Sequence, residues 1–237
     1  MCVIAYQQPG AEVSGNKFRR CWDKNSDGGG LSYIDDGKVV VSKGYFNMKE
    51  MLGEYRKQRE LHPDSPFILH FRIATHGAVN EENTHPFYVR DDLVLAHNGI
   101  LSNFGSKELS DTKDYIDSVL KNLPNGWEDN EALVWLVENS LGYGNKFCLL
   151  RADGEAIILN ESAGEWVDDV WYSNSSWKKY KKFGNSTHSL VPANTVGKLE
   201  ETKHWFDIDE QYAEYEGVPC AYCDHDLDYY DAEWCAE

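Results

Sequence analysis

The chain has 237 residues and a net charge of −17, because 40 Asp and Glu outnumber 23 Lys and Arg. That charge would repel a phosphate backbone, which excludes a general nucleic-acid-binding surface, and no run approaches the ~20 apolar residues of a membrane span. The start has neither a basic segment nor a long apolar run, so no secretory signal is expected. We therefore predict a cytoplasmic protein whose 6 cysteines are reduced thiols, a nucleophile or metal ligands.

Strand-like runs and one amphipathic helix are predicted in the first part of the chain. Residues 2–6 are apolar enough for a buried strand. Residues 31–34 and 38–42 flank an Asp-Asp-Gly turn, which is typical of a β-hairpin. Asn47 is a helix N-cap candidate, and apolar residues then recur at helical spacing until the helix ends near His62.

Hairpins also dominate the rest of the chain. Strands are predicted over residues 67–73, 85–89, 93–97, 146–151, 155–160, 170–173 and 189–196, and helices from the Ser110-Asp111-Thr112 cap onward and over residues 129–141. Because βαβ alternation is absent, the pattern favours an α+β fold of antiparallel sheets with helices packed outside. We expect one domain over residues 1–197 and an acidic, cysteine-containing tail over residues 198–237.

Cys2 is the first candidate for chemistry. If Met1 is removed, one residue carries both a thiol and a free α-amine, whose pKa of about 7.7–8.0 leaves a usable fraction unprotonated near neutral pH. The amine can then accept the thiol proton, and the thiolate is the reactive nucleophile.

Four further segments make this interpretation specific. They are residues 25–30 (NSDGGG), 70–77 (HFRIATHG), 97–103 (HNGILSN) and 110–112 (SDT). In this order after an N-terminal cysteine, they resemble the class II glutamine amidotransferase family, in layout its small stand-alone members. The resemblance covers about residues 2–195 and implies an N-terminal-nucleophile (Ntn) hydrolase fold, a four-layer αββα sandwich of two antiparallel sheets with outer helices.

The resemblance also implies a glutamine pocket. Arg72 stands at the family's position for binding the substrate α-carboxylate, a task that suits a guanidinium. Asp111 matches the acidic residue that receives the α-ammonium, although it could instead be only the cap of its helix. Backbone groups of Thr75, His76 and Gly77 would line the pocket.

The Asn98 side chain and the Gly99 N–H would stabilise the oxyanion that forms when the thiolate attacks the amide. The expected reaction releases ammonia, leaves a γ-glutamyl thioester on Cys2 and ends with hydrolysis to glutamate. Ser173 and Asn174 are further candidates for the pocket wall. No cofactor is expected at this site. The expected partner is an ammonia-accepting enzyme or acceptor substrate, since known members couple ammonia release to an acceptor site.

Other interpretations remain open. His70, His76 and His97 would suit a Cys–His pair, although a terminal amine already supplies a base. The same fold could hydrolyse a γ-glutamyl amide of a larger amine, or serve as a non-catalytic interaction protein. The glycine run at 28–30 is a weak phosphate-loop candidate, because no Lys-Ser/Thr pair follows it.

The tail contains a Cys-x2-Cys pair, which is a zinc half-site. Cys220 and Cys223, with Cys235 and either His225 or His204, could supply the ligands of a structural zinc ion. The alternative is a set of reduced thiols on an acidic tail that docks a partner.

Overall fold

Two antiparallel sheets packed face to face form the first of the two units of this chain. The computed structural model describes residues 2–75, 77–179, 218–219 and 226–227. The two units are Met1–Lys179 and Tyr180–Glu237. In the second unit, the described residues are the strands β11 (Val218–Pro219) and β12 (Asp226–Leu227), which pair antiparallel.

Several predictions for the C-terminal part fall outside the described residues. They are the strand over residues 189–196, the domain boundary at residue 197, and the candidate zinc ligands His204, Cys220, Cys223, His225 and Cys235. They stay predictions. In the part of the chain that the structure describes, every helix is too short or too polar to cross a membrane.

The first unit follows the predicted order of hairpins and helices. Its strands and α-helices are β1 (Val3–Gln7), α1 (Gly15–Lys24), β2 (Gly29–Asp35), β3 (Lys38–Tyr45), α2 (Met48–Leu61), β4 (Phe67–Phe71), β5 (Phe87–Arg90), β6 (Leu93–Asn98), α3 (Asp111–Ser118), α4 (Glu131–Leu141), β7 (Lys146–Arg151), β8 (Ala156–Leu159), β9 (Glu165–Val167) and β10 (Val170–Tyr172).

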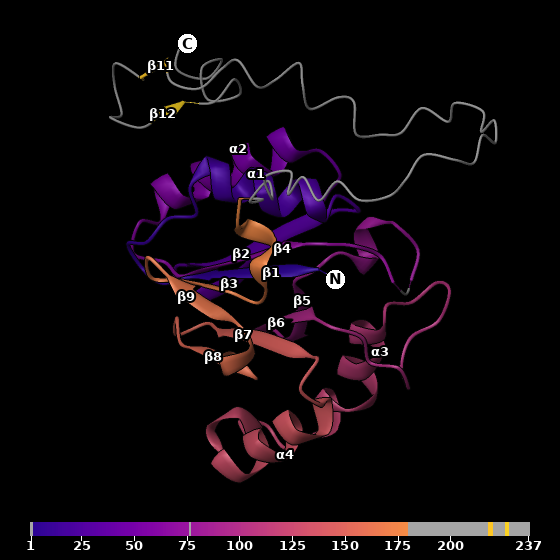
Figure 1. Ribbon diagram of the computed structural model, residues 1–237. Coiled ribbons are helices and arrows are strands. Elements are labelled where there is room, and N and C mark those ends of the chain that lie inside the picture. Colours follow the sequence, from indigo (N-terminus) through magenta and orange to yellow (C-terminus); the bar gives the residue numbers. More distant parts are fainter. Residues whose placement is uncertain (1, 76, 180–217, 220–225, 228–237) are drawn as a thin grey trace, which may run out of the picture. The chain divides into compact units, whose positions relative to one another are not determined.

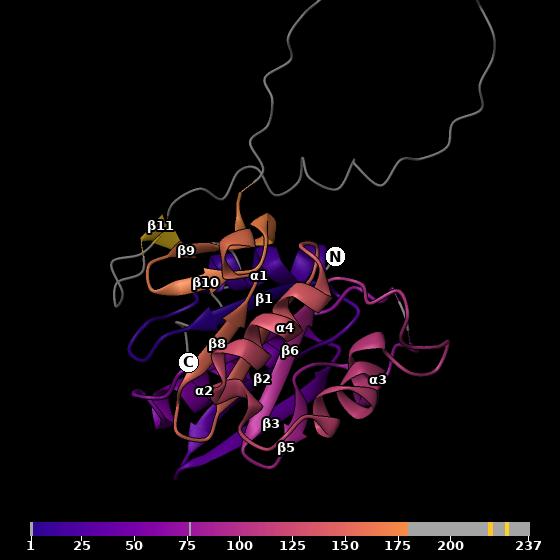
Figure 2. The same cartoon turned by 90° about the horizontal axis from the view of Figure 1, so that it is seen from below.

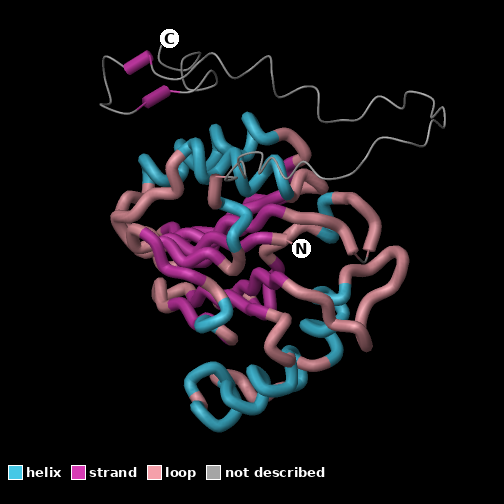
Figure 3. The backbone as a smooth tube through the Cα atoms, in the orientation of Figure 1, coloured by secondary structure: helices cyan, strands magenta, loops and turns pink. Residues whose placement is uncertain are grey.

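These elements form four layers. The larger sheet has the strand order β3-β2-β4-β1-β10-β9 and the smaller sheet β5-β6-β7-β8, and every pairing is antiparallel. Helices α1 and α2 cover the outer face of the larger sheet, and α3 and α4 cover the outer face of the smaller one (Figure 1, Figure 2). Figure 3 shows the same succession of helix and strand layers. The predicted αββα sandwich is confirmed.

Alternate residues of β1 face different layers. Val3 and Ala5 pack in the apolar cluster beneath α1 and α2, whereas Ile4 and Tyr6 pack in the cluster between the two sheets. The residues of β6 divide in the same way between the neighbouring sheet and the helices α3 and α4. A strand that is buried on both faces is apolar at consecutive positions, which is the pattern that predicted these strands.

The two helices over the larger sheet differ in how well the sequence predicts them. The α2 prediction is confirmed, and the side chain of Asn47 caps the helix by accepting the Lys49 N–H at 2.8 Å. Helix α1 was not predicted, because only Phe18, Cys21 and Trp22 interrupt its polar sequence. These three side chains are buried, so tertiary packing rather than helix propensity stabilises α1.

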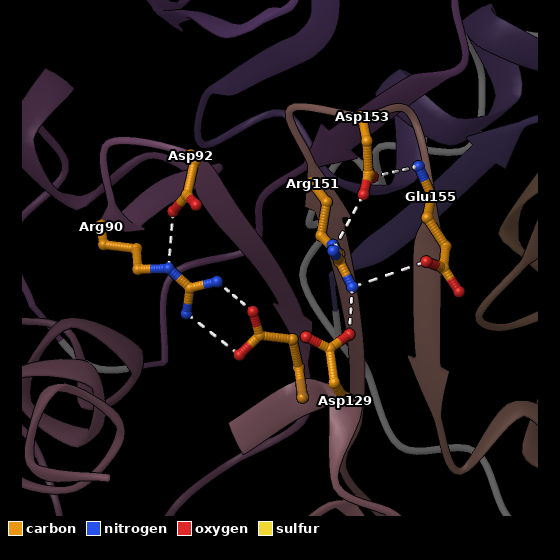
Figure 4. Close-up of polar contacts among 7 residues, drawn as sticks. Arg90, Asp92, Asp129, Arg151, Asp153 and Glu155 are labelled. Carbon is orange, nitrogen blue, oxygen red and sulfur yellow. Dashed lines mark hydrogen bonds and ion pairs between the residues drawn. The ribbon is translucent and has the colours of Figure 1, made fainter. Parts of the chain in front are cut away.

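Ion pairs tie the smaller sheet to the segment before α4. Arg90 Nη1 donates to Glu128 Oε2 at 3.0 Å, and the Glu128 side chain is only 1% exposed. Arg90 also pairs with Asp92, and Arg151 pairs with Asp129, Asp153 and Glu155 (Figure 4). Exposed ion pairs contribute only ~0–1 kcal/mol each to the free energy of folding. The pair between Arg90 and the buried carboxylate of Glu128 is therefore the structurally important one of this group.

Candidate active site

The ends of three strands and the start of one helix meet at the site. Strands β1 and β4 run antiparallel side by side, so Cys2, just before β1, lies beside Arg72, just after β4. Asn98 is the last residue of β6 in the other sheet, and Asp111 is the first residue of α3. Residues that are far apart in the sequence are thus brought together at one edge of the sandwich.

A small cavity that is partly open to solvent lies between these ends. It is lined by Cys2, Arg72, Ile73, Thr75, His85, His97, Gly99, Ser110, Asp111 and Thr112. Most of the predicted site residues therefore share one cavity. Asn98 and Gly77 do not line it, and His76 lies outside the described residues.

The thiol of Cys2 is held by the backbone of Ile73. The Sγ atom accepts the Ile73 N–H at 3.3 Å and donates to the Ile73 carbonyl at 3.4 Å. The Asn174 side chain donates to the Cys2 carbonyl at 2.6 Å. Burial raises the pKa of the Cys2 thiol, although the Ile73 N–H and the charge of Arg72 oppose that rise. The thiol therefore needs a base to become the nucleophilic thiolate at neutral pH.

Arg72 presents a buried cation to the cavity. Strand β4 ends at Phe71, not at residue 73 as predicted, because the chain leaves the sheet here to enter the site. The guanidinium donates to the carbonyls of Ala78 at 3.0 Å and Gly77 at 3.3 Å. Burial lowers the pKa of Arg72, while the neighbouring thiol and two carboxylates raise it. A fixed guanidinium suits the bidentate binding of a carboxylate.

Asp111 presents a carboxylate to the same cavity. Its Oδ2 accepts the Leu101 N–H at 2.8 Å and its Oδ1 accepts the Thr112 N–H at 2.8 Å. Ser110 rather than Asp111 is the N-cap of α3, since its Oγ accepts the Lys113 N–H at 3.2 Å. A carboxylate offers about four lone-pair sites, so Asp111 retains capacity for a cation.

Asn98 and Gly99 lie where β6 ends. The Asn98 Nδ2 donates at 2.7 Å to Ser173 Oγ, which also accepts the Ile4 N–H at 2.8 Å. A Cβ atom at Gly99 would lie 2.1 Å from Asn145 Oδ1, so only glycine fits at this position. Gly99 therefore reaches the cavity as bare backbone, and Ser173 holds the Asn98 amide in a fixed orientation.

His97 is hydrogen-bonded through both ring nitrogens. The Asn145 Nδ2 donates to the Leu141 carbonyl at 2.6 Å, which leaves its Oδ1 to accept the His97 Nε2–H at 2.9 Å. The His97 Nδ1 is then an acceptor, and it receives the Thr112 hydroxyl proton at 2.8 Å. His70 Nε2 donates to the His97 carbonyl at 3.0 Å. His97 is therefore fixed in place and has no free nitrogen to take a thiol proton.

The sequence interpretation gave no role in the site to several lining residues, among them Ile73 and His85. Ile73 acts through its backbone, so its residue type carries no signal. His85 precedes Pro86 in a segment that was predicted only as a strand; the structure begins β5 at Phe87 instead. Among the described residues, no group of three or more His, Cys, Asp or Glu side chains is arranged to hold a metal ion.

The buried histidines predict a fall in stability at mildly acidic pH. Burial lowers the pKa of His70 to about 3, and lowers those of His85 and His97, from an ordinary value of 6.5. Below pH 6.5 the unfolded chain therefore binds protons that the folded protein refuses. The free energy of unfolding should be highest above that pH and decrease below it, by up to about 1.4 kcal/mol per pH unit for each histidine.

Urea unfolding between about pH 7 and about pH 5 measures this slope, in a range where most carboxylates stay ionised. A His70→Gln variant retains an N–H for the His97 carbonyl but has one buried histidine fewer. Its free energy of unfolding should therefore fall less steeply with decreasing pH, by up to about 1.4 kcal/mol per pH unit. An equal pH dependence of the free energy of unfolding in the two proteins would contradict a lowered pKa of His70 in the folded protein.

The chain is also similar in sequence to known proteins. A sequence model of the family described as class II glutamine amidotransferases matches residues 4–157. Among curated relatives, the glutamine–fructose-6-phosphate aminotransferase [isomerizing] of Agrobacterium fabrum (strain C58 / ATCC 33970) is 35% identical over 112 residues, which are 45% of this chain and 17% of that protein. The enzyme of the same name from Gluconobacter oxydans (strain 621H) is 28% identical over 144 residues, 61% of this chain and 22% of that one.

Solved structures are also similar. Among them is the glutamine phosphoribosylpyrophosphate (PRPP) amidotransferase from B. subtilis complexed with ADP and GMP, with a TM-score of 0.47 and 20% sequence identity. The match covers 75% of this chain and 42% of that one.

Proposed function

We propose, from the premise that this chain belongs to the class II glutamine amidotransferases, that it hydrolyses glutamine to glutamate and ammonia with Cys2 as the nucleophile. The observation that carries the proposal is the shared cavity of Cys2, Arg72 and Asp111. A guanidinium and a carboxylate on its wall complement the α-carboxylate and α-ammonium of a free amino acid. The thiol lies in the same cavity, where the side-chain amide of such a ligand can meet it.

The reaction begins with removal of Met1, which gives Cys2 a free α-amine. The amine takes the thiol proton, and the thiolate attacks the amide carbon, so that a C–S bond forms and the carbonyl electrons move onto oxygen. The Gly99 N–H and the Asn98 side chain stabilise this oxyanion. The ammonium returns its proton to the amide nitrogen, the C–N bond breaks and ammonia leaves. Water then cleaves the thioester, which yields glutamate and the thiol.

The hydrogen bonds of the site support the amine as the base. His97 lines the cavity, but both of its ring nitrogens are engaged. Burial lowers the pKa of His85 well below its ordinary value, so that ring is a poor proton acceptor. The amine of Cys2 belongs to the same residue as the thiol and has a pKa of about 7.7–8.0, close to the working pH.

For the ammonia acceptor, we propose only the kind of molecule that receives the ammonia. This chain spans 17% to 22% of the length of the curated relatives described above. We propose that ammonia passes to an acceptor substrate or a partner enzyme, and that the reaction takes place in the cytoplasm.

Incubation of the purified protein with glutamine tests the proposed function. We expect equimolar glutamate and ammonia, loss of Met1 in the intact mass, and a transient adduct of one glutamyl group on Cys2. Turnover of a γ-glutamyl amide of a larger amine, with no turnover of glutamine, would support the alternative substrate. Absence of both turnover and adduct with either substrate would favour a non-catalytic protein.

A further inference from the structure

The glycine run at residues 28–30 has a packing role that points to the cavity. A Cβ atom at Gly30 would lie 2.3 Å from the His85 carbonyl oxygen, and one at Gly29 would lie 2.5 Å from Met51 Sδ. Such distances exclude any larger residue at either position unless the neighbouring atoms move. The run therefore lets the segment around His85 approach β2 closely, which a phosphate-binding loop would not require.

The segment that carries His85 is anchored on both sides. The Thr84 Oγ1 accepts the Gly44 N–H at 3.0 Å, and Lys43 Nζ donates to the Thr84 carbonyl at 2.9 Å. Lys43 Nζ also lies 4.4 Å from the centre of the Phe87 ring. Both neighbours of the His85-Pro86 pair are thus tied to β3, which fixes the backbone of His85 beside the cavity.

The His85 side chain has unused hydrogen-bonding capacity in a buried position. The residue is 4% exposed and lines the cavity. Its ring lies 4.1 Å from the ring of His70 and 4.5 Å from that of Phe87, measured between centroids. Neither ring nitrogen has a hydrogen-bond partner among the described residues. An unpaired buried polar group is unfavourable, and a ligand in the cavity that His85 lines can supply the missing partners.

We propose that His85 is a further catalytic residue, whose ring hydrogen-bonds the nitrogen of the scissile amide and then the water that replaces ammonia. The inference rests on the proposed function. The other groups of glutamine already have complements: Arg72 for the carboxylate, Asp111 for the ammonium, and the end of β6 for the carbonyl oxygen. The amide nitrogen is the group that remains.

The chemistry of the ring matches that nitrogen. A neutral imidazole offers one N–H donor and one acceptor nitrogen. The amide nitrogen donates through its hydrogens and, once the carbon is tetrahedral, accepts through its lone pair; the incoming water can do both as well. Burial keeps the ring uncharged at neutral pH, so it orients these groups without taking the proton that ammonia needs to leave.

Two substitutions at His85 separate the effect of hydrogen bonding by the ring from the effect of its shape. His85→Phe retains a ring and removes both polar atoms, and we expect kcat for glutamine hydrolysis to fall ~10- to 100-fold with KM changed less than about 3-fold. His85→Gln retains a donor and an acceptor and should stay within about 5-fold of the wild type. His62→Gln, on a partly exposed histidine outside the cavity, is the matched control. Equal kcat for the wild type and a folded His85→Phe protein would overturn the inference.

A binding measurement needs no turnover. In a Cys2→Ala protein with ¹⁵N-labelled histidine, glutamine should shift the His85 ring resonances, which are identified by their loss in His85→Gln. Saturable glutamine binding that leaves these resonances unmoved would overturn the inference while leaving the proposed function intact. A wild-type protein that neither binds nor hydrolyses glutamine would overturn the proposed function, and the role of His85 with it.

Discussion

Replacing Cys2 by alanine is expected to reduce glutamine hydrolysis by at least about 10³-fold, because the covalent route through the thioester is lost. The residual rate would come from substrate binding and oxyanion stabilisation alone. Cys2→Ser should behave almost as severely, since a hydroxyl is a far weaker proton donor to the terminal amine than a thiol. Initial rates of glutamate release, with intact mass to verify removal of Met1, measure both effects.

Cys21 provides the matched control for this prediction. Burial raises the pKa of its thiol to about 12. Cys21 is a residue of α1 that packs in the apolar cluster between this helix and the larger sheet, and it does not line the cavity. Cys21→Ala should therefore retain activity at the cost of some stability. Full activity in the Cys2→Ala protein, or in wild-type protein that still carries Met1, would exclude the proposed nucleophile or its base.

Replacing Asn98 by alanine is expected to lower kcat by about 10²- to 10³-fold with little change in KM, as for the loss of one oxyanion donor. One N–H of the Asn98 amide is committed to Ser173, so the other is the one proposed to face the oxyanion. Asn98→Asp keeps the shape of the side chain but adds a negative charge beside the developing oxyanion. Its kcat should therefore fall at least as much as that of Asn98→Ala. Asn139→Ala, on the exposed face of α4, is the control.

Ser173 tests whether the orientation of Asn98 matters. Its hydroxyl joins Asn98 to the Ile4 N–H of β1. Ser173→Ala should lower kcat by roughly 10-fold, and the double variant with Asn98→Ala should be no slower than Asn98→Ala alone. If the fall in kcat of the double variant equals the product of the two single falls, Ser173 does not act through Asn98.

Local patterns predicted much of the fold correctly. The Asp36-Gly37 pair has positive φ at both positions, 47° and 71°, as a tight hairpin between β2 and β3 requires. Strand β9 (Glu165–Val167) was not predicted, because a three-residue run carries little periodicity and depends on its pairing with β10. Helix α1 was missed for a similar reason, since three buried residues are a short signal.

The site likewise has some residues that the sequence indicated and others that only the tertiary structure reveals. The resemblance to the amidotransferase family singled out Cys2, Arg72 and Asp111 as candidates, and they line one cavity. It did not identify His85, because nothing in the order of residues shows that its ring nitrogens are unpaired or that Gly30 makes room for its backbone. Nor did it show that His97 is engaged through both nitrogens.

The sequence by itself therefore predicted the hairpins, the helix α2 and an α+β fold with helices outside the sheets, and its resemblance to the family implied the layers and the candidate site residues. Only the tertiary structure decided which of those groups are already engaged and which are left for a ligand. The physical reason is that periodicity and turn chemistry act between near neighbours in the chain. The bonds that hold the site, such as Asn174 to Cys2 and Asn98 to Ser173, instead join residues that are 172 and 75 positions apart in the chain.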